Sequence, residues 1–317
     1  MRTYNRFPGF ARWAGIAVAV GCGVAGTQCT SQEDDGGTTF GLTPPGLEPV
    51  RFAPEVLSVE RHPHGSLTFS SNGREIYWSA FLEEGPEQTV FYSVFDGDSL
   101  STPRIAPFAP EYAGGPSFSY DGQRILFNSR IAQPNREHAL YGIWFVQRFA
   151  TGWTIPEQIP ATFDTSQTAG QTTLAQNGNL YFSSRIWSER LPKLYRSVFS
   201  NGTYGEPEQL QGPINMPSAI DPFVDPDERF LLFAAGIGRS DTGGRSDIHI
   251  SHRLEDGSWG EPVNLGLAYN VESDYFDRFP SMSRDGKYLF FVRALGDTFP
   301  SYDTHFYWVS AEVLEGL

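Results

Sequence analysis

The pattern of apolar and polar residues along the chain repeats five times. Each copy has an apolar residue, then a variant of Ser-x-Asp-Gly, then a stretch of alternating apolar positions, and successive turns lie 49 to 58 residues apart. A repeat at this spacing is typical of proteins built from one supersecondary unit used many times. The copies occupy residues 68–78, 117–127, 174–182, 223–233 and 281–291.

Asn-Gly or Asp-Gly between two apolar runs predicts a β-hairpin whose two turn residues both tolerate a positive φ. The fourth copy has Asp227-Glu228 instead, which predicts a turn of another type. A further alternating segment follows each hairpin, and in three copies a turn with Gly or Ser and an aromatic residue leads on to a fourth strand. Four antiparallel strands are the content of one β-propeller blade. The third strands are expected at residues 90–94, 141–145, 194–198, 247–251 and 304–308.

The count of strands predicts an all-β, five-bladed β-propeller over residues 49–317. The fifth unit ends at residues 307–311 without a fourth strand, and residues 50–57 form a surplus segment before the first unit. Pairing the two would complete blade five and remove two open sheet edges. We therefore expect an N-terminal strand to close blade five.

Several of these segments resemble the PD40 (WD40-like, TolB-type) propeller repeats of bacterial envelope proteins. The resemblance rests on residues 116–122, on residues 247–251 with 259–266, and on residues 307–311. It implies a propeller fold and, by analogy of fold, an interaction scaffold in the cell envelope. The matching positions are turn and packing residues, so the resemblance implies no particular activity.

Composition agrees with this fold and limits the partners. The chain of 317 residues has 33 Gly and 23 Pro, and its net charge of -14 opposes binding to nucleic acid or to anionic lipid. The acidity fits a soluble exported protein, or one that meets cationic ligands or metal ions. No nucleophile-elbow motif and no metal-ligand spacing occurs, so the sequence predicts no cofactor and no metal site.

The N-terminus has the three parts of a secretory signal peptide. Arg2, Arg6 and Arg12 form a positive region, residues 14–20 form an apolar core, and small residues follow. The core is far shorter than the ~20 residues of a transmembrane helix. We expect residues 1–21 to be removed and the protein to reach the periplasm or the cell surface.

Both cysteines of the chain, Cys22 and Cys29, follow this segment. Residues 19–22 resemble a bacterial lipobox, with Ala19 in place of the usual leucine, and this predicts lipid attachment to Cys22 as the protein's one link to a membrane. Residues 22–48 contain few bulky apolar residues and are predicted to form a flexible tether. The alternative is cleavage near Ala25, which would leave a soluble periplasmic protein.

In a propeller the first strand of each blade lines the central channel. Aligning the five copies on their turns gives mostly small residues where these strands begin, as crowding near the axis requires. The polar exceptions predict a ligand-binding cluster at one end of the channel: His64, Gln171, Asp221, Asp277 and Arg278. The alternative is that these side chains only satisfy backbone groups and hold water.

A second candidate for ligand contact is Arg185 with Trp187, because a cation beside an indole ring suits stacking against a sugar or a peptide. The alternative is an ion pair between this arginine and an acidic residue at the start of a third strand.

These features predict a non-catalytic, envelope-anchored propeller that binds a protein, peptide or glycan over one face. The alternative function is that of a carbohydrate-active hydrolase or lyase, which would use Asp221, Asp277 and His64 as its acidic and basic groups. A purely structural module of an envelope complex is the third possibility.

The lipid anchor can be tested directly. A Cys22→Ser variant is expected to lose metabolic labelling with fatty acid and to move from the membrane fraction to the soluble fraction, because the thiol that would carry the lipid is gone. Cys29→Ser is the matched control and should remain labelled. Unchanged labelling and membrane association in Cys22→Ser would contradict the prediction.

Overall fold

The chain is described from a computed structural model. It describes residues 39–57, 62–82, 88–110, 112–130, 142–159, 167–186, 191–236, 246–267, 275–295 and 303–317, without the side chains of 167–169 and 185–186. These residues belong to one packed unit, Asp35–Leu317. No helix within them has the length and hydropathy needed to span a membrane.

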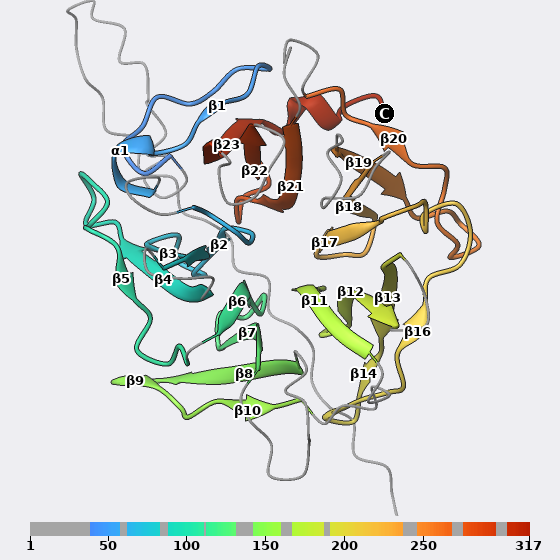
Figure 1. The fold of residues 1–317 in the computed structure, drawn as a ribbon, viewed down its shortest axis with the longest axis horizontal. Coiled ribbons are helices and arrows are strands. Elements are labelled where there is room, and N and C mark those ends of the chain that lie inside the picture. Colours follow the sequence, from blue (N-terminus) through green and yellow to red (C-terminus); the bar gives the residue numbers. More distant parts are fainter. Residues whose placement is uncertain are drawn as a thin grey trace, which may run out of the picture. The chain divides into compact units, whose positions relative to one another are not determined.

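Five antiparallel sheets surround a central axis, which confirms the predicted five-bladed β-propeller (Figure 1). The first strand of each blade lies nearest the axis. The second strands are buried almost throughout, because the faces of neighbouring blades cover both of their sides. Blade one comprises β2 (Thr68–Phe69), β3 (Glu75–Phe81), β4 (Gln88–Val94) and β5 (Arg104–Ile105). Blade two comprises β6 (Ala113–Phe118), β7 (Arg124–Ser129), β8 (Gly142–Phe149) and β10 (Glu157–Gln158), with β9 (Gly152–Trp153) paired to β8.

The remaining blades repeat this order. Blade three comprises β11 (Gln167–Leu174), β12 (Leu180–Ile186), β13 (Lys193–Ser197) and β16 (Glu208–Gln209), next to the small hairpin of β14 (Phe199–Ser200) and β15 (Thr203–Tyr204). Blade four comprises β17 (Ile220–Val224), β18 (Phe230–Ala235), β19 (Asp247–His252) and β20 (Val263–Asn264). Blade five comprises β21 (Tyr275–Met282), β22 (Tyr288–Leu295), β23 (Asp303–Ser310) and the N-terminal β1 (Val50–Arg51).

The pairing of β1 with β23 closes the ring as predicted. Val50 lies opposite Trp308 in an antiparallel register, and the Phe52 N–H donates to the Phe306 carbonyl at 2.8 Å. The strand is shorter than expected, since Pro54–Leu57 forms the short helix α1. At the other terminus a 3-10 helix, η1 (Ala311–Leu314), follows β23.

The packed unit begins before the predicted boundary at residue 49. Phe40 is buried and its ring lies 5.8 Å from that of Phe52, 5.7 Å from that of Phe69 and 5.7 Å from that of Phe95. Part of the segment predicted as tether therefore packs against blades one and five. This segment contains few apolar residues, but Phe40 is buried in the hydrophobic core and Leu42 packs against that core.

All five hairpin turns share one hydrogen bond and one left-handed residue. The residue that follows the Asn or Asp donates its backbone N–H to the carbonyl three residues earlier, at 2.8–3.0 Å, and only this residue has a positive φ. The Asn or Asp stays at negative φ, and in four blades its side chain accepts a backbone N–H two residues on. The main-chain bond that closes the hairpin encloses three loop residues in blade three, where Ala175 donates to Asn179, and four in the other blades. The expectation of two positive-φ residues was wrong, because each turn has one.

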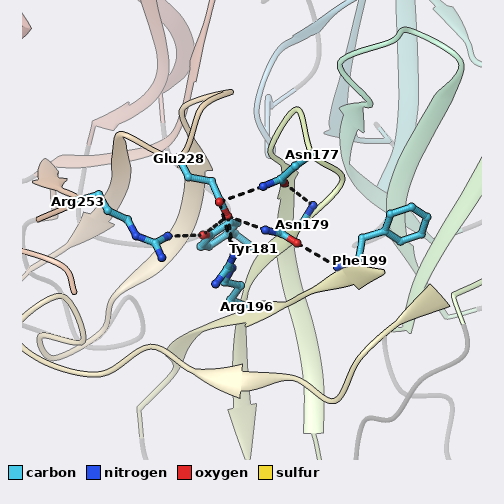
Figure 2. A network of polar contacts seen from close by, with 7 residues as sticks. All are labelled: Asn177, Asn179, Tyr181, Arg196, Phe199, Glu228 and Arg253. Atoms are coloured by element: carbon cyan, nitrogen blue, oxygen red, sulfur yellow. Dashed lines mark hydrogen bonds and ion pairs between the residues drawn. The ribbon is translucent and has the colours of Figure 1, made fainter. Parts of the chain in front are cut away.

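Glu228 takes the position of the glycine in blade four, with φ 57°, so the prediction of a different turn there was also wrong. A non-glycine residue at this φ costs about 1 kcal/mol or more and needs compensation. Figure 2 shows where it comes from: the Glu228 carboxylate accepts hydrogen bonds from Tyr181 at 2.6 Å and from Asn179 at 2.9 Å, and it pairs with Arg196 at 3.2 Å. All three partners belong to blade three, so this turn links two blades.

Burial raises the pKa of Glu228, but the hydrogen bonds from Tyr181 and Asn179 and the charge of Arg196 outweigh it, and the net pKa is lowered. The carboxylate is therefore ionised at neutral pH. Its contribution to stability is full above the pKa of a glutamate in the unfolded chain and is lost as the pH falls through the lowered pKa.

We predict that Glu228→Ala lowers the free energy of unfolding by about 2–3 kcal/mol, because charged hydrogen bonds are lost while the strained φ remains. Glu228→Gly should lose about 1 kcal/mol less, because glycine relieves the strain. Urea unfolding followed by tryptophan fluorescence measures both. A Glu228→Gln protein should approach the wild type in stability as the pH falls. A glycine variant as stable as the wild type would contradict the assigned role.

Candidate functional site

The inner strands of blades two to five share an irregularity that positions the side chains at one end of the channel. In each of them two residues of the inner strand lie opposite one residue of the second strand, which shifts the register by one. In blade two this occurs between Gly114 and Ser117, and β11, β17 and β21 have corresponding shifts. The inserted residues include Gly115, Gln171, Asp221 and Phe279. A β-bulge bends the strand and redirects the side chain it carries, which is why bulges are frequent near binding sites.

Two of these residues are held in an unfavourable backbone conformation. Asp221 has φ 54° and Phe279 has φ 56°, while Gly115 has φ 57° without strain. A bulky residue in the left-handed region is an outlier that the surrounding structure must enforce. The three residues show that the bulge itself, rather than the residue type, sets this conformation.

Four of the predicted channel residues form a cluster or lie beside it. Arg278 binds the buried Asp221 with both its Nε and Nη2 atoms, at 2.7 and 3.2 Å from the carboxylate oxygens. The guanidinium also lies 4.5 Å from the centroid of the Phe279 ring, and the centroid of the His64 ring lies 4.9 Å from that of the same phenylalanine. Gln171 is buried in the next blade.

His64 is neutral in this setting. Burial, followed by the nearby charge of Arg278, lowers the pKa of His64 to about 3. Its main chain is fixed as well, because the carbonyl accepts hydrogen bonds from Ser79 and Gln88 and the N–H donates to Ser79. The neutral imidazole packs against the rings of Phe81 and Phe279.

Asp277 is not part of this cluster. It precedes Arg278 on β21, and successive side chains of a strand point to opposite faces. Its carboxylate binds Arg293 of the next strand at 2.7 and 2.6 Å, and Arg293 also donates to the Leu267 carbonyl of blade four at 3.1 Å. Burial raises the pKa of Asp277 to about 6, although the hydrogen bonds and charge of Arg293 oppose the shift. The pair joins two blades.

The second predicted contact pairs Arg185 with Trp187. The side chain of Arg185 and the whole of Trp187 lie outside the described part of the chain. Cys22 and residues 1–38 lie outside it too. Among the residues that are described, no group of three or more His, Cys, Asp or Glu side chains is placed to hold a metal ion.

The opposite end of the channel, beside the hairpin turns, holds a cavity of about 370 Å³ that all five blades line. Its lining begins near Ser66 and Gln171 and ends at the turns, and it includes neither Asp221 nor Arg278. Of the five predicted channel residues, Gln171 lines the cavity, and His64, Asp221, Asp277 and Arg278 do not.

Arg284, which the sequence analysis missed, crosses the mouth of this cavity. Its Nε donates to the Phe69 carbonyl of blade one and its Nη2 donates to the Ser119 carbonyl of blade two, each at 3.0 Å. The guanidinium lies 5.2 Å from the ring of Tyr120 and 5.9 Å from that of Phe118. Burial lowers the pKa of Arg284, against the opposing charges of Tyr120 and Asp121.

The signal for Arg284 was the variable residue of the Ser-x-Asp-Gly pattern. This position holds Ser71, Tyr120, Gln176, Pro226 and Arg284 in the five blades. Four of the five line the cavity, all but Ser71. Because the turns lie around the cavity, these four variable residues face one ligand-sized space.

Comparison with known proteins gives structural matches only. No protein-family model matches the chain, and no curated protein matches its sequence. An α-L-arabinofuranosidase from Lactobacillus brevis is 14% identical, with a TM-score of 0.51 over 81% of this chain and 93% of that chain. A putative TolB from Agrobacterium tumefaciens is 17% identical, with a TM-score of 0.48 over 78% of this chain and 76% of that one.

A TolB from Acinetobacter baumannii is 14% identical, with a TM-score of 0.44 over 78% of this chain. The chain spans only 56% of that protein. At these identities the likeness concerns the fold. The chain is a five-bladed β-propeller. An enzyme shares this fold, and the fold alone does not define a function, so the function of the chain depends on its own site.

The buried His64 makes the stability of the propeller depend on pH. Its pKa is lower in the folded than in the unfolded chain, so the stabilisation is full above about pH 6.5 and falls by at most about 1.4 kcal/mol per pH unit as the pH drops toward 4. In a His64→Gln variant this part of the acid sensitivity should be absent. Unfolding midpoints of both proteins between pH 4 and pH 8 test this, and parallel curves would contradict it.

Proposed function

We propose that this propeller is a non-catalytic binding protein whose protein, peptide or glycan ligand lies over the hairpin-turn face, at the mouth of the central channel. One observation carries the proposal: the cavity of about 370 Å³ lies beside the turns of all five blades and has Arg284 at its mouth. This volume is in the usual range for ligand pockets.

The contacts of the acidic residues favour binding over catalysis. Asp221 is bound by Arg278 and Asp277 by Arg293, in each case through two hydrogen bonds. A general acid or base must exchange a proton with the substrate within hydrogen-bond reach, and these carboxylates are already occupied. His64 is neutral and packed between rings.

The alternative, a carbohydrate-active hydrolase or lyase, has a direct test. The wild type and the Asp221→Asn and Asp277→Asn variants are incubated with a panel of polysaccharides, and released reducing ends or unsaturated products are measured. Turnover by the wild type that either variant loses while still folded would favour the enzyme over the binding protein.

The location of the protein is part of the proposal. Export by the signal peptide of residues 1–21, lipid attachment at Cys22 and a tether in residues 22–48 are supported by the sequence features described above. The packing of Phe40 places the end of this tether against the propeller. The binding face would then act at a membrane surface within the envelope or at the cell surface.

The binding face can be tested by narrowing the cavity from an exposed position. Gln176 is exposed and lines the mouth, so Gln176→Trp should obstruct it without disturbing the fold. On an array of synthetic peptides and envelope oligosaccharides, this variant is expected to lose at least about 10-fold in affinity for whatever the wild type binds. Ile155→Trp is the control, because Ile155 is 81% exposed and outside the cavity. Equal binding by both variants would contradict the proposed face.

A further inference from the structure

The guanidinium of Arg284 has donors to spare at the mouth of the cavity. Two of its N–H groups donate to the Phe69 and Ser119 carbonyls, and among the described residues it forms no ion pair with a carboxylate. Arg229, at the same mouth, is instead bound to Asp225 through its Nε and Nη2 atoms. A partly buried arginine held by backbone carbonyls, with free donors, is prepared for an anion, and a carboxylate matches its planar geometry.

One level of the cavity lining is apolar. Leu67, Pro116, Pro222 and Pro280 stand at equivalent positions of four inner strands, and the fifth is Thr172. The polar Ser66 and Gln171 also line the cavity, so the apolar contact is confined to this level. An apolar side chain fits this level better than a sugar, whose hydroxyl groups would lie against the prolines without partners.

The charge of the site limits the anion to a single negative charge. Arg284 is one cation, Asp227 and Asp285 also line the mouth, and the chain carries a net charge of -14. A phosphate or another multiply charged group would meet this surrounding negative charge. A carboxylate is the anion that one guanidinium neutralises.

We propose that the ligand is a peptide whose C-terminal residue enters the cavity, with its carboxylate on Arg284 and its apolar side chain against Leu67 and the three prolines. Only the last residue of a peptide carries a carboxylate and an apolar side chain together. This inference rests on the proposed function, since it names the ligand class for the same face.

The test uses two synthetic pentapeptide libraries, immobilised through their N-termini, with either a free acid or an amide at the C-terminus. Free-acid peptides that end in an apolar residue should be selected. By calorimetry with the best sequence, the amide form should bind the wild type about 10- to 100-fold more weakly, because a charged hydrogen-bonded pair is lost.

Variants then assign the contacts. Arg284→Gln should weaken the free acid by a similar factor and leave the amide nearly unchanged, while Lys287→Gln, an equal change of charge in the same turn but outside the cavity, should leave both unchanged. If Arg284→Gln folds poorly, the comparison of acid and amide peptides on the wild type still tests the proposal.

Three outcomes overturn the inference. One is equal binding of acid and amide peptides; another is an Arg284→Gln variant that folds and keeps the preference for the acid. The third is that the wild type binds oligosaccharides but no peptide, and that Gln176→Trp loses this binding. That result would support the proposed binding face and contradict a peptide as its ligand. If neither peptides nor oligosaccharides bind the wild type, the proposed function fails together with the inference.

Discussion

The antiparallel pairing of β1 with β23 joins the two ends of the propeller and closes its ring. A propeller blade cannot bury both faces of its sheet alone, so each blade is stable only between two others. The β1–β23 pairing completes blade five with a strand from the opposite end of the packed unit and leaves no unpaired edge at the junction. It also brings Phe52 to 5.0 Å from Phe290 and 5.1 Å from Trp308, which joins the hydrophobic cores of blades five and one.

Closure determines the geometry of the channel because the contacts that shape it run between blades. Ser66 of blade one donates to the Pro280 carbonyl of blade five, and Arg284 extends from blade five to the carbonyls of blades one and two. The Phe118 N–H of blade two donates to Thr68 of blade one at 2.9 Å. If the ring opened, these contacts would be lost together. The geometry of the binding face therefore depends on the pairing of β1 with β23 at the outer side of blade five.

The two ends of the channel differ in how their charges are used. At the end with the bulges, Asp221 and Arg278 neutralise each other, and the cost of the left-handed Asp221 is offset by this pair and its packing. At the turn end, Arg229 is neutralised by Asp225, whereas Arg284 donates to two carbonyl groups, lies beside the Tyr120 ring and forms no ion pair with a carboxylate of the described residues. An arginine paired with a carboxylate of the protein stabilises the ring. An arginine bonded to neutral carbonyl groups keeps its net charge and can still bind an anionic ligand.

The repeat, the number of blades and the closing strand could be predicted from the sequence, because alternation, turn residues and strand count are local properties that repetition reinforces. Alignment of the repeats also identified the channel residues, but it grouped Asp277 with Asp221, whereas the alternation of β21 sends Asp277 and Arg278 to opposite faces. The tertiary structure was needed to show which charges pair and that contacts with blade three hold Glu228 in a glycine's conformation. It was needed equally to place Arg284 at the cavity, where it forms no ion pair with a carboxylate of the described residues. These depend on distances between blades, to which residues far apart in the chain contribute, and no local pattern contains them.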